Sequence, residues 1–245
     1  MYLLGFACSY LLIRYQINEE ANLTATEKQE EKKHLENLVL VIIFGVIVGG
    51  RLGYVLFYNP GYFLEHPGEI LATWHGGMSF HGGAMASIVG GWWYARKMQL
   101  NFWKWADRVI VTVPIGLGLG RIGNFINGEL YGRPTDVPWA MIFPDGGLVP
   151  RHPSQLYEAF LEGAVLFVIL WSCRKKNWMP GMKLALFLML YGVFRFFVEF
   201  FRQPDEQLGY LLWSWMTMGQ ILSTIMFVAG VFLWSYLKRR KHGVC

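Results

Sequence analysis

Residues 116–132, with the sequence GLGLGRIGNFINGELYG, combine a glycine-rich stretch with several polar side chains. Arg121, Asn124, Asn127 and Glu129 follow an apolar run within nine residues. Such side chains are costly at membrane depth, where they usually face a cavity or a partner. The planar guanidinium of an arginine donates paired hydrogen bonds that suit a phosphate. This stretch is a candidate anion site, although a helix end with its interfacial loop would carry the same residues.

A second group of polar residues follows the period of a helix. Tyr191, Arg195, Glu199 and Arg202 are spaced i, i+4, i+8 and i+11 in an otherwise apolar stretch, which places them on one helical face. A polar stripe in such a helix must face protein or a water-filled cleft. The stripe therefore indicates either a second part of an anion site or a packing network in which Glu199 neutralises the two arginines.

His81 is the side chain best suited to move a proton. It lies in the sequence WHGGMSFHGG, residues 74–83, whose glycines would let a lipid headgroup approach the backbone. An unperturbed imidazole pKa of about 6.5 suits proton transfer near neutral pH. Arg51 lies in the outer half of the preceding apolar run and would join the same site. The alternatives are a satisfied histidine near the membrane interface and, for Arg51, a packing or snorkelling role.

The patterns of common metal and nucleophile sites are absent from the sequence. It contains no GxSxG, HExxH or P-loop pattern, no acidic cluster suited to Mg²⁺, and no CxxC spacing among its three cysteines. We therefore expect no metal, no cofactor, and a nucleophile supplied by a substrate. Four arginines and a histidine would outnumber the nearby acids, with Glu199 the one acid on a helix and Glu129 on the adjoining loop. This excess positive charge predicts that an anionic phospholipid binds here, without by itself predicting catalysis.

The composition indicates that a membrane surrounds these residues. Of 245 residues, 54% are hydrophobic and 16% are charged, against about 25% charged in ordinary globular domains. The apolar residues are gathered in long runs, which are typical of an integral membrane protein. The net charge of +5 does not indicate nucleic-acid binding, because the basic residues lie in short loops between those runs.

The apolar runs predict seven membrane helices. They cover residues 1–13, 38–57, 78–95, 106–120, 156–173, 183–201 and 213–237. The first run is too short for the roughly 20 residues that a membrane helix needs. The expected fold class is all-α: a polytopic membrane helical bundle of seven transmembrane helices, the first truncated, with interfacial outer loops. We expect residues 1–245 to form one integral-membrane domain.

Lysine and arginine counts in the loops predict the orientation in the membrane. The basic loops place the C-terminus in the cytoplasm and, with seven spans, the N-terminus outside. Residues 14–36 mix acids and bases, and like charges at i and i+4 predict a solvated, mobile cytoplasmic connector. Residues 58–77 and 121–156 are the expected outer segments. This orientation brings the four arginines and His81 to the depth of the outer leaflet.

Five segments closely resemble the prolipoprotein diacylglyceryl transferases of bacteria. They are GGRLGYVLFYN (49–59), GGMSFHGG (76–83), GRIGNFINGELYG (120–132), RHPSQLYE (151–158) and YGVFRFFVEFFRQPD (191–205). The resemblance covers nearly the whole chain except the charged connector. Members of that family normally continue upstream of the position of Met1, with a functionally important tyrosine in a Tyr-Gly pair. Its absence here is a departure that fits a fragment or a misplaced start.

The resemblance implies a seven-helix enzyme of the bacterial inner membrane. Such an enzyme transfers the diacylglyceryl group of phosphatidylglycerol to the lipobox cysteine thiol in the signal peptide of a prolipoprotein, forming a thioether and releasing glycerol phosphate. This is the first step of bacterial lipoprotein maturation. The implied catalytic positions are His81, Arg121, Tyr191 and Arg195. The substrate-binding positions are Arg121, Asn124, Glu129, Gly132, Glu199, Arg202 and, from the charge argument, Arg51.

Two other function classes stay open on the residues alone. A non-catalytic lipid carrier or receptor would use the same anion site, and formation of thioether or free glycerol phosphate would distinguish an enzyme from it. An intramembrane protease would need its own catalytic group, for which only His81 with Glu199 is available. Peptide cleavage without lipid attachment would support that class.

Overall fold

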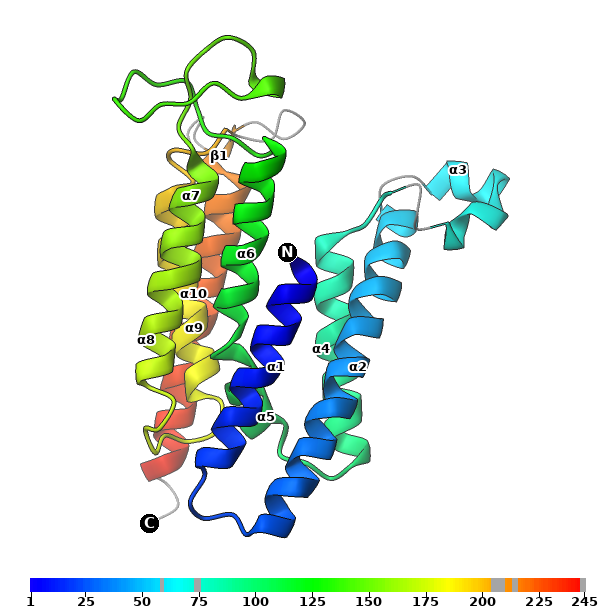
Figure 1. Cartoon of the computed structure of the whole chain (residues 1–245), viewed down its shortest axis with the longest axis vertical. Coiled ribbons are helices and arrows are strands. Elements are labelled where there is room, and N and C mark those ends of the chain that lie inside the picture. Colours follow the sequence, from blue (N-terminus) through cyan, green and yellow to red (C-terminus); the bar gives the residue numbers. More distant parts are fainter. Residues whose placement is uncertain (58–59, 73–75, 204–209, 213–215, 243–245) are drawn as a thin grey trace. The chain divides into compact units, whose positions relative to one another are not determined.

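Most of the described chain is helical (Figure 1). The structure is a computed structural model of residues 1–245, and it describes all of them except residues 58–59, 73–75, 204–209, 213–215 and 243–245. The chain divides into two compact units. The larger unit comprises Met1–Ile13 and Ala106–Cys245, and the smaller unit comprises Arg14–Trp105.

The smaller unit is built on two helices that pack through glycines. Its helices are α2 (Ala25–Phe57), α3 (Pro60–Glu65), the 3₁₀ helix η1 (Pro67–Leu71) and α4 (Phe80–Lys97). α2 and α4 lie side by side, and Gly45, Gly49 and Gly53 of α2 recur at the four-residue spacing that allows membrane helices to approach closely. A Cβ atom on Gly49 would overlap the Gly82 carbonyl and the Ala86 side chain of α4. The close packing of α2 on α4 therefore requires residues without a side chain at these glycine positions.

The larger unit contains the helices that carry most of the predicted site. They are α6 (Val113–Asn127), α7 (Ser154–Glu158), the π-helical segment η4 (Ala159–Val165), α8 (Leu166–Ser172), α9 (Met182–Val198) and α10 (Met218–His242). α7, η4 and α8 follow one another without a break. The 3₁₀ helix η3 (Pro144–Gly146) lies in the loop before α7, and β1 (Tyr210–Leu212) pairs antiparallel with β2 (Met216–Thr217) before α10. Helices α1 (Tyr2–Glu19) and α5 (Phe102–Ile110) contribute residues to both units.

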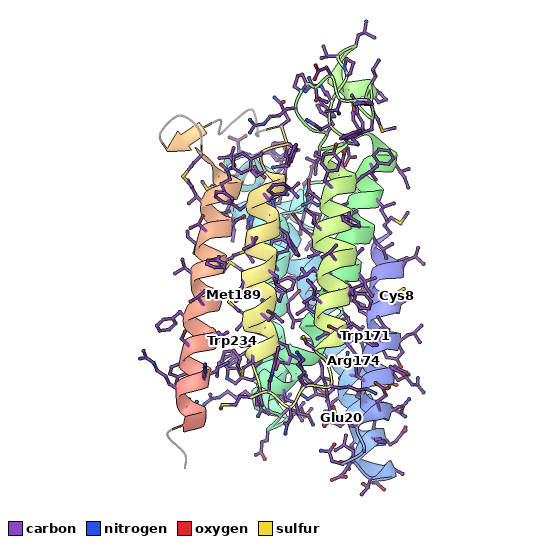
Figure 2. The ribbon with its side chains drawn as sticks, turned by 90° about the vertical axis from the view of Figure 1, so that its left-hand side faces the viewer. Cys8, Glu20, Trp171, Arg174, Met189 and Trp234 are labelled. Atoms are coloured by element: carbon purple, nitrogen blue, oxygen red, sulfur yellow. The ribbon has the colours of Figure 1, made fainter. Side chains whose placement is uncertain are left out.

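The core of the larger unit is apolar and joins its helices. The buried cluster consists of Val111, Leu166, Leu170 and Phe187. α9 packs on α10 at Gly230, where a Cβ atom would meet the side chain of Met189 at 2.8 Å (Figure 2). Asp107 fixes the start of α9, because its carboxylate accepts hydrogen bonds from the N–H groups of Gly181 and Leu184, both at 2.9 Å.

Three helical segments in the described part of the chain are long and apolar enough to cross a membrane: Ala25–Phe57, Ser154–Ser172 and Met218–Arg240. α5 and α6, bent by 40°, make a fourth if they are counted as one span. The chain is therefore a helical membrane protein, as predicted, while the number of seven spans stays a prediction. Just beyond α8, Arg174 stacks over Trp171 at 4.3 Å (Figure 2), and basic and aromatic residues of this kind are common at membrane interfaces.

The charged segment 14–36 differs from the expected mobile connector. α1 continues to Glu19 and α2 already begins at Ala25. Thr24 and Glu27 cap α2 reciprocally: the N–H and Oγ1 of Thr24 both donate to the Glu27 carboxylate at 2.8 Å, and the Glu27 N–H donates to Thr24 Oγ1 at 3.3 Å. This capping box outweighs the weak repulsion of like charges at i and i+4.

α6 extends beyond its predicted end at residue 120. It continues to Asn127, where Gly128 adopts a φ of 73° and ends the helix, as glycine commonly does in the left-handed conformation. Arg121 therefore lies within α6, so the predicted outer segment 121–156 begins with helical residues and not with a loop. A helical Arg121 has a more fixed position than a loop residue would have.

Candidate active site

Two buried glutamates lie at the centre of the candidate site in the larger unit. Glu158 is the last residue of α7 and Glu162 lies in the π-helical segment η4. Their side chains are 0% and 1% exposed. A buried carboxylate needs a partner charge or hydrogen bonds, and π-helical turns frequently occur at functional sites. These two acids and the residues around them are therefore candidates for the functional site.

Glu158 joins two arginines that come from different helices. Its Oε2 atom lies 2.7 Å from Nε of Arg121 on α6 and 2.7 Å from Nη1 of Arg195 on α9. Arg195 also lies 3.7 Å from Glu162 Oε1 and 2.8 Å from Glu199 Oε2. The result is a network of ion pairs that links α6, α7, η4 and α9.

The polar stripe at the end of α9 forms the other side of this network. Arg202 Nη1 lies 3.7 Å from Glu199 Oε1, and Arg195 contacts the other oxygen of the same carboxylate. The hydroxyl of Thr217 donates to Glu199 Oε1 at 3.0 Å. The side chains of Arg195, Glu199 and Arg202 meet as predicted, but α9 ends at Val198, so Arg202 reaches Glu199 from beyond the helix and not from one helical face.

The expected excess of positive charge is wrong for this network. Among the residues that the structure describes, three guanidinium groups pair with three carboxylates in this network, so their formal charges cancel. Our sequence analysis recognised Glu199 as the one acid on a helix and missed Glu158 and Glu162. Both lie in the apolar run 156–173, and an ionisable residue within a membrane span is itself a signal of function. Applying that rule to acids as well as to arginines would have found them.

Arg121 has donor atoms left for a ligand. Within the described residues its ion-pair partner is Glu158, which contacts Nε and leaves both terminal nitrogens. The Arg121 side chain is 23% exposed, against 12% for Arg195, whose two terminal nitrogens both face carboxylates. The two terminal nitrogens of Arg121 can therefore donate paired hydrogen bonds to two oxygens of a phosphate.

The polar residues that follow Arg121 bond to one another. The side-chain amides of Asn124 and Asn127 each donate to the Glu129 carboxylate at 3.3 Å. Gln155 donates to the backbone carbonyl of Glu129 at 2.6 Å, which ties the end of α6 to the start of α7. Two predicted substrate-binding residues, Asn124 and Glu129, are thus brought together one turn from Arg121.

Gly132 lies where three backbone segments meet. Its N–H donates to the His152 carbonyl at 2.9 Å, and it forms an isolated β-bridge with Arg202. A Cβ atom at this position would lie 2.6 Å from the carbonyl oxygens of both His152 and Phe201. Close packing alone therefore explains a glycine here, and a role of Gly132 in substrate binding stays a prediction.

Tyr191 lies between the apolar core and the ion pairs. Its ring stacks on Phe187 with centroids 5.5 Å apart, and its hydroxyl interacts electrostatically with Glu162 and Arg195. This predicted catalytic position therefore adjoins the network, on the side of α9 that faces η4.

Close contact between two glycines sets the distance between Arg121 and Glu158. A Cβ atom on Gly163 of η4 would lie 2.7 Å from the Cα of Gly118 on α6. We expect Gly163→Ala to push α6 away from η4, separate the ion pair, and lower the transfer rate at least about tenfold, because small misplacements at an active site are costly. Gly120→Ala is the matched control, since a Cβ there meets no described atom within 4 Å. An unchanged rate for Gly163→Ala would contradict this reading.

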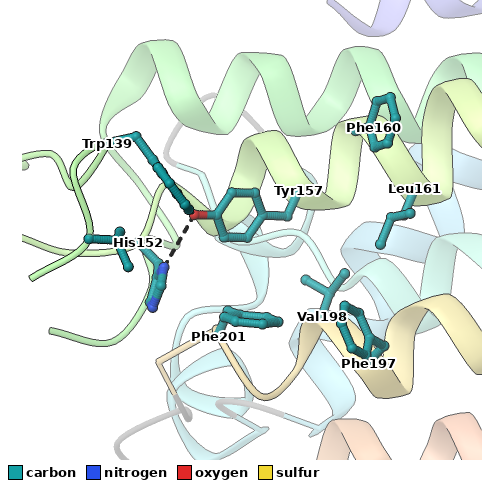
Figure 3. Close-up of a pocket in the computed structure, with 9 residues that line it drawn as sticks. Trp139, His152, Tyr157, Phe160, Leu161, Phe197, Val198 and Phe201 are labelled. Atoms are coloured by element: carbon teal, nitrogen blue, oxygen red, sulfur yellow. Dashed lines mark hydrogen bonds between the residues drawn. The ribbon is translucent and has the colours of Figure 1, made fainter. Parts of the chain in front are cut away.

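A hollow of about 470 Å³ lies beside the loop that joins α6 to α7, residues 128–153 (Figure 3). Its lining is almost entirely apolar and comes from this loop, α7, η4 and the end of α9 with the residues just after it: Val137, Trp139, His152, Tyr157, Phe160, Leu161, Phe197, Val198 and Phe201. Trp139 Nε1 donates to the Tyr157 hydroxyl at 2.6 Å, and that hydroxyl lies 3.2 Å from His152 Nδ1. Burial lowers the pKa of His152 below its usual value, which favours a neutral ring whose Nδ1 can accept a hydrogen bond from the Tyr157 hydroxyl.

The depressed pKa of His152 predicts a loss of stability in acid. Above the unfolded-state pKa of about 6.5 the ring is neutral in both the folded and the unfolded state, so His152 does not lower the stability of the fold. As the pH falls below that value, the unfolded chain binds the proton more readily than the folded one, so the stability declines until the folded-state pKa is passed. We expect the thermal midpoint of the wild type to fall as the pH drops below about 6.5, and His152→Gln to flatten this slope. A slope that persists unchanged in His152→Gln would exclude His152 as its source.

In the smaller unit, Arg51 binds backbone carbonyl groups. Its buried guanidinium donates to the carbonyl oxygens of Glu69 at 2.7 Å, Ile70 at 2.8 Å and Gly77 at 3.1 Å, and also to that of Gly76. The side chain thus fastens the segment between α2 and α4, in agreement with the packing role weighed from the sequence. Its predicted contact with a lipid phosphate stays a prediction.

His81 lies in the first turn of α4 and is exposed. Ser79 caps this turn by accepting the Gly82 N–H at 3.2 Å, which fixes the backbone that carries the imidazole. His81 and Arg51 belong to the smaller unit, whereas the other predicted site residues belong to the larger one. Their predicted meeting in one pocket stays a prediction.

Comparisons with known proteins give a consistent result. A family model described as prolipoprotein diacylglyceryl transferase matches residues 1–236. The phosphatidylglycerol–prolipoprotein diacylglyceryl transferase of Desulfotalea psychrophila is 52% identical over 247 residues, covering 98% of this chain and 88% of the relative. The enzymes of the same name from Bordetella avium and Geobacter sulfurreducens are 53% and 50% identical over 243 residues, covering 98% and 99% of this chain and 89% and 91% of the relatives.

Proposed function

Because the chain belongs to the prolipoprotein diacylglyceryl transferase family, we propose that it transfers the diacylglyceryl group of phosphatidylglycerol to a cysteine thiol of a prolipoprotein. It is a membrane-embedded transferase of lipoprotein biosynthesis, placed in the bacterial inner membrane. The observation that carries the proposal is the outer edge of Arg121, a guanidinium held on Nε by a buried carboxylate with its terminal nitrogens left for a phosphate.

The reaction exchanges one bond for another at a glycerol carbon of the lipid. The peptide sulfur forms the new carbon–sulfur bond, and the carbon–oxygen bond to the phosphate breaks with its electron pair on the departing oxygen. The thiol proton passes to a base, for which His81 is the proposed residue, and glycerol phosphate leaves. Arg121 stabilises the charge that grows on the phosphate as the bond breaks.

The remaining predicted residues have supporting roles in this proposal. Arg195 and Glu199 hold the network in place, and Arg202 extends it toward the headgroup. Asn124 and Tyr191 orient the lipid. Glu129, Gly132 and Arg51 complete the proposed substrate-binding positions by shaping the loops around them.

We also propose the membrane arrangement that the basic loops predict. Seven spans form one integral-membrane domain, the C-terminus lies in the cytoplasm, and the site faces the outer leaflet. The thiol acceptor is the lipobox cysteine of the signal peptide. Labelling of single cysteines placed in the loops, from either side of sealed membrane vesicles, tests this arrangement.

The function is tested by incubating the full chain in phosphatidylglycerol vesicles with a lipobox peptide. We expect mass spectrometry to show the peptide with an added diacylglyceryl group, and glycerol phosphate to appear in equal amount. A peptide with serine in place of the lipobox cysteine is the control, and should stay unmodified. Bound lipid without thioether, or cleaved peptide without lipid, would contradict the proposal in favour of a carrier or a protease.

A further inference from the structure

Glu158 differs from the other acids of the network in how its oxygens are used. Its carboxylate is fully buried, and one oxygen, Oε2, contacts both Arg121 and Arg195 at 2.7 Å. The other oxygen, Oε1, has no hydrogen-bond partner among the residues that the structure describes, as is also the case for both oxygens of Glu162 and for Glu199 Oε2, so the difference lies in the one oxygen that contacts two arginines. A carboxylate that served mainly to cap a helix or to satisfy backbone groups would bond N–H groups instead, as Asp107 does. The interactions of Glu158 are concentrated on the two guanidinium groups.

Loss of Glu158 would affect these two arginines unequally. Arg195 would keep Glu199 at 2.8 Å and Glu162 at 3.7 Å. Arg121 would lose the one ion-pair partner that it has in the described chain. A guanidinium is a rigid planar fork, so a contact at Nε also fixes the direction of both terminal nitrogens. The orientation of Arg121 therefore depends on Glu158 far more than that of Arg195 does.

We propose that Glu158 is a positioning residue, which holds Arg121 at Nε so that its two terminal nitrogens present one fixed edge to the lipid phosphate. This inference rests on the proposed function and adds a residue that the sequence analysis did not include. In this role Glu158 acts through Arg121 and does not touch the reacting atoms. The close contact between Gly118 and Gly163 supports it, because it sets the distance between the helices that carry the pair.

Glu158→Gln keeps the volume of the side chain and an acceptor oxygen but removes the charge. We expect kcat/KM for phosphatidylglycerol to fall about 10- to 100-fold, since misplacement by about 1 Å costs about 10²-fold. The decisive measurement repeats the substitution in two backgrounds. In Arg121→Lys, which has no fork to orient, the further loss should be less than about threefold; in His81→Gln the full loss should persist.

Asp107→Asn is the matched control, because it neutralises another buried acid of the same unit, whose carboxylate accepts hydrogen bonds from the backbone N–H groups of Gly181 and Leu184. It should lower the thermal midpoint while changing kcat/KM less than about twofold. If Glu158→Gln does not fold, Glu158→Asp is put through the same two backgrounds with the same expectation. Equal losses in both backgrounds would overturn the positioning role. Absence of thioether product from the unmodified chain would instead overturn the proposed function.

Discussion

Arg121→Ala is expected to lower kcat for diacylglyceryl transfer between about 10²- and 10³-fold, the usual cost of removing one donor that stabilises developing charge. Its terminal nitrogens are the donors that the network leaves for a ligand, and Glu158 holds them in one direction. The substitution removes both the positive charge and the paired hydrogen bonds. The rate of thioether formation at saturating phosphatidylglycerol measures the effect.

Arg96→Ala provides the control for this substitution. Arg96 lies in the last turn of α4 and stacks over Trp92 at 5.7 Å, so its loss removes a guanidinium of the same size outside the ion-pair network. We expect its rate to stay within about twofold of the wild type. A wild-type rate for Arg121→Ala would remove Arg121 from the mechanism.

Arg195→Leu is expected to lower the free energy of unfolding by about 3–5 kcal/mol, the typical cost of leaving a buried ion pair without one partner. Arg195 is the cation nearest to Glu162 and contacts Glu158 and Glu199 as well. Without it, buried carboxylates face an apolar side chain. Denaturant titration of the purified protein in detergent micelles measures the change.

Arg195→Lys separates the charge of this residue from its shape. Lysine keeps one positive charge but cannot bridge three carboxylates with a planar fork. We therefore expect the free energy of unfolding of Arg195→Lys to lie between that of the wild type and that of Arg195→Leu. If Arg195→Leu unfolds at the same denaturant concentration as the wild type, the buried network does not stabilise the fold.

The length of the apolar runs predicted the helical membrane class, and helical spacing predicted that the side chains of Arg195 and Glu199 meet. Both depend on the local sequence, because residues three and four apart lie together on any helix. The family resemblance rested on contiguous motifs and is supported by relatives about 50% identical over nearly the whole chain. These are properties that a single sequence states directly.

The partners of the arginines depend on contacts between helices, which spacing does not reveal. Nothing in the sequence marks the π-helical segment Ala159–Val165 or the contact of Gly118 with Gly163 that brings Glu158 beside Arg121. The predicted excess of positive charge was wrong for the same reason. It compared the arginines of several helices with the acid of one helix, Glu199, and left out Glu158 and Glu162. The end of α6 was placed too early because the apolar run stops before the charged residue Arg121, whereas the helix continues to Asn127 and ends at Gly128.

Binding of glycerol phosphate, the proposed leaving group, tests the central claim most directly because it needs no turnover. Isothermal titration calorimetry measures the affinity of the full chain in detergent micelles for glycerol phosphate. The wild type, Arg121→Ala and Arg96→Ala are compared. We expect saturable binding that Arg121→Ala weakens at least about tenfold and Arg96→Ala leaves in place. Equal affinity of the wild type and Arg121→Ala would contradict it, because the phosphate would then be held elsewhere.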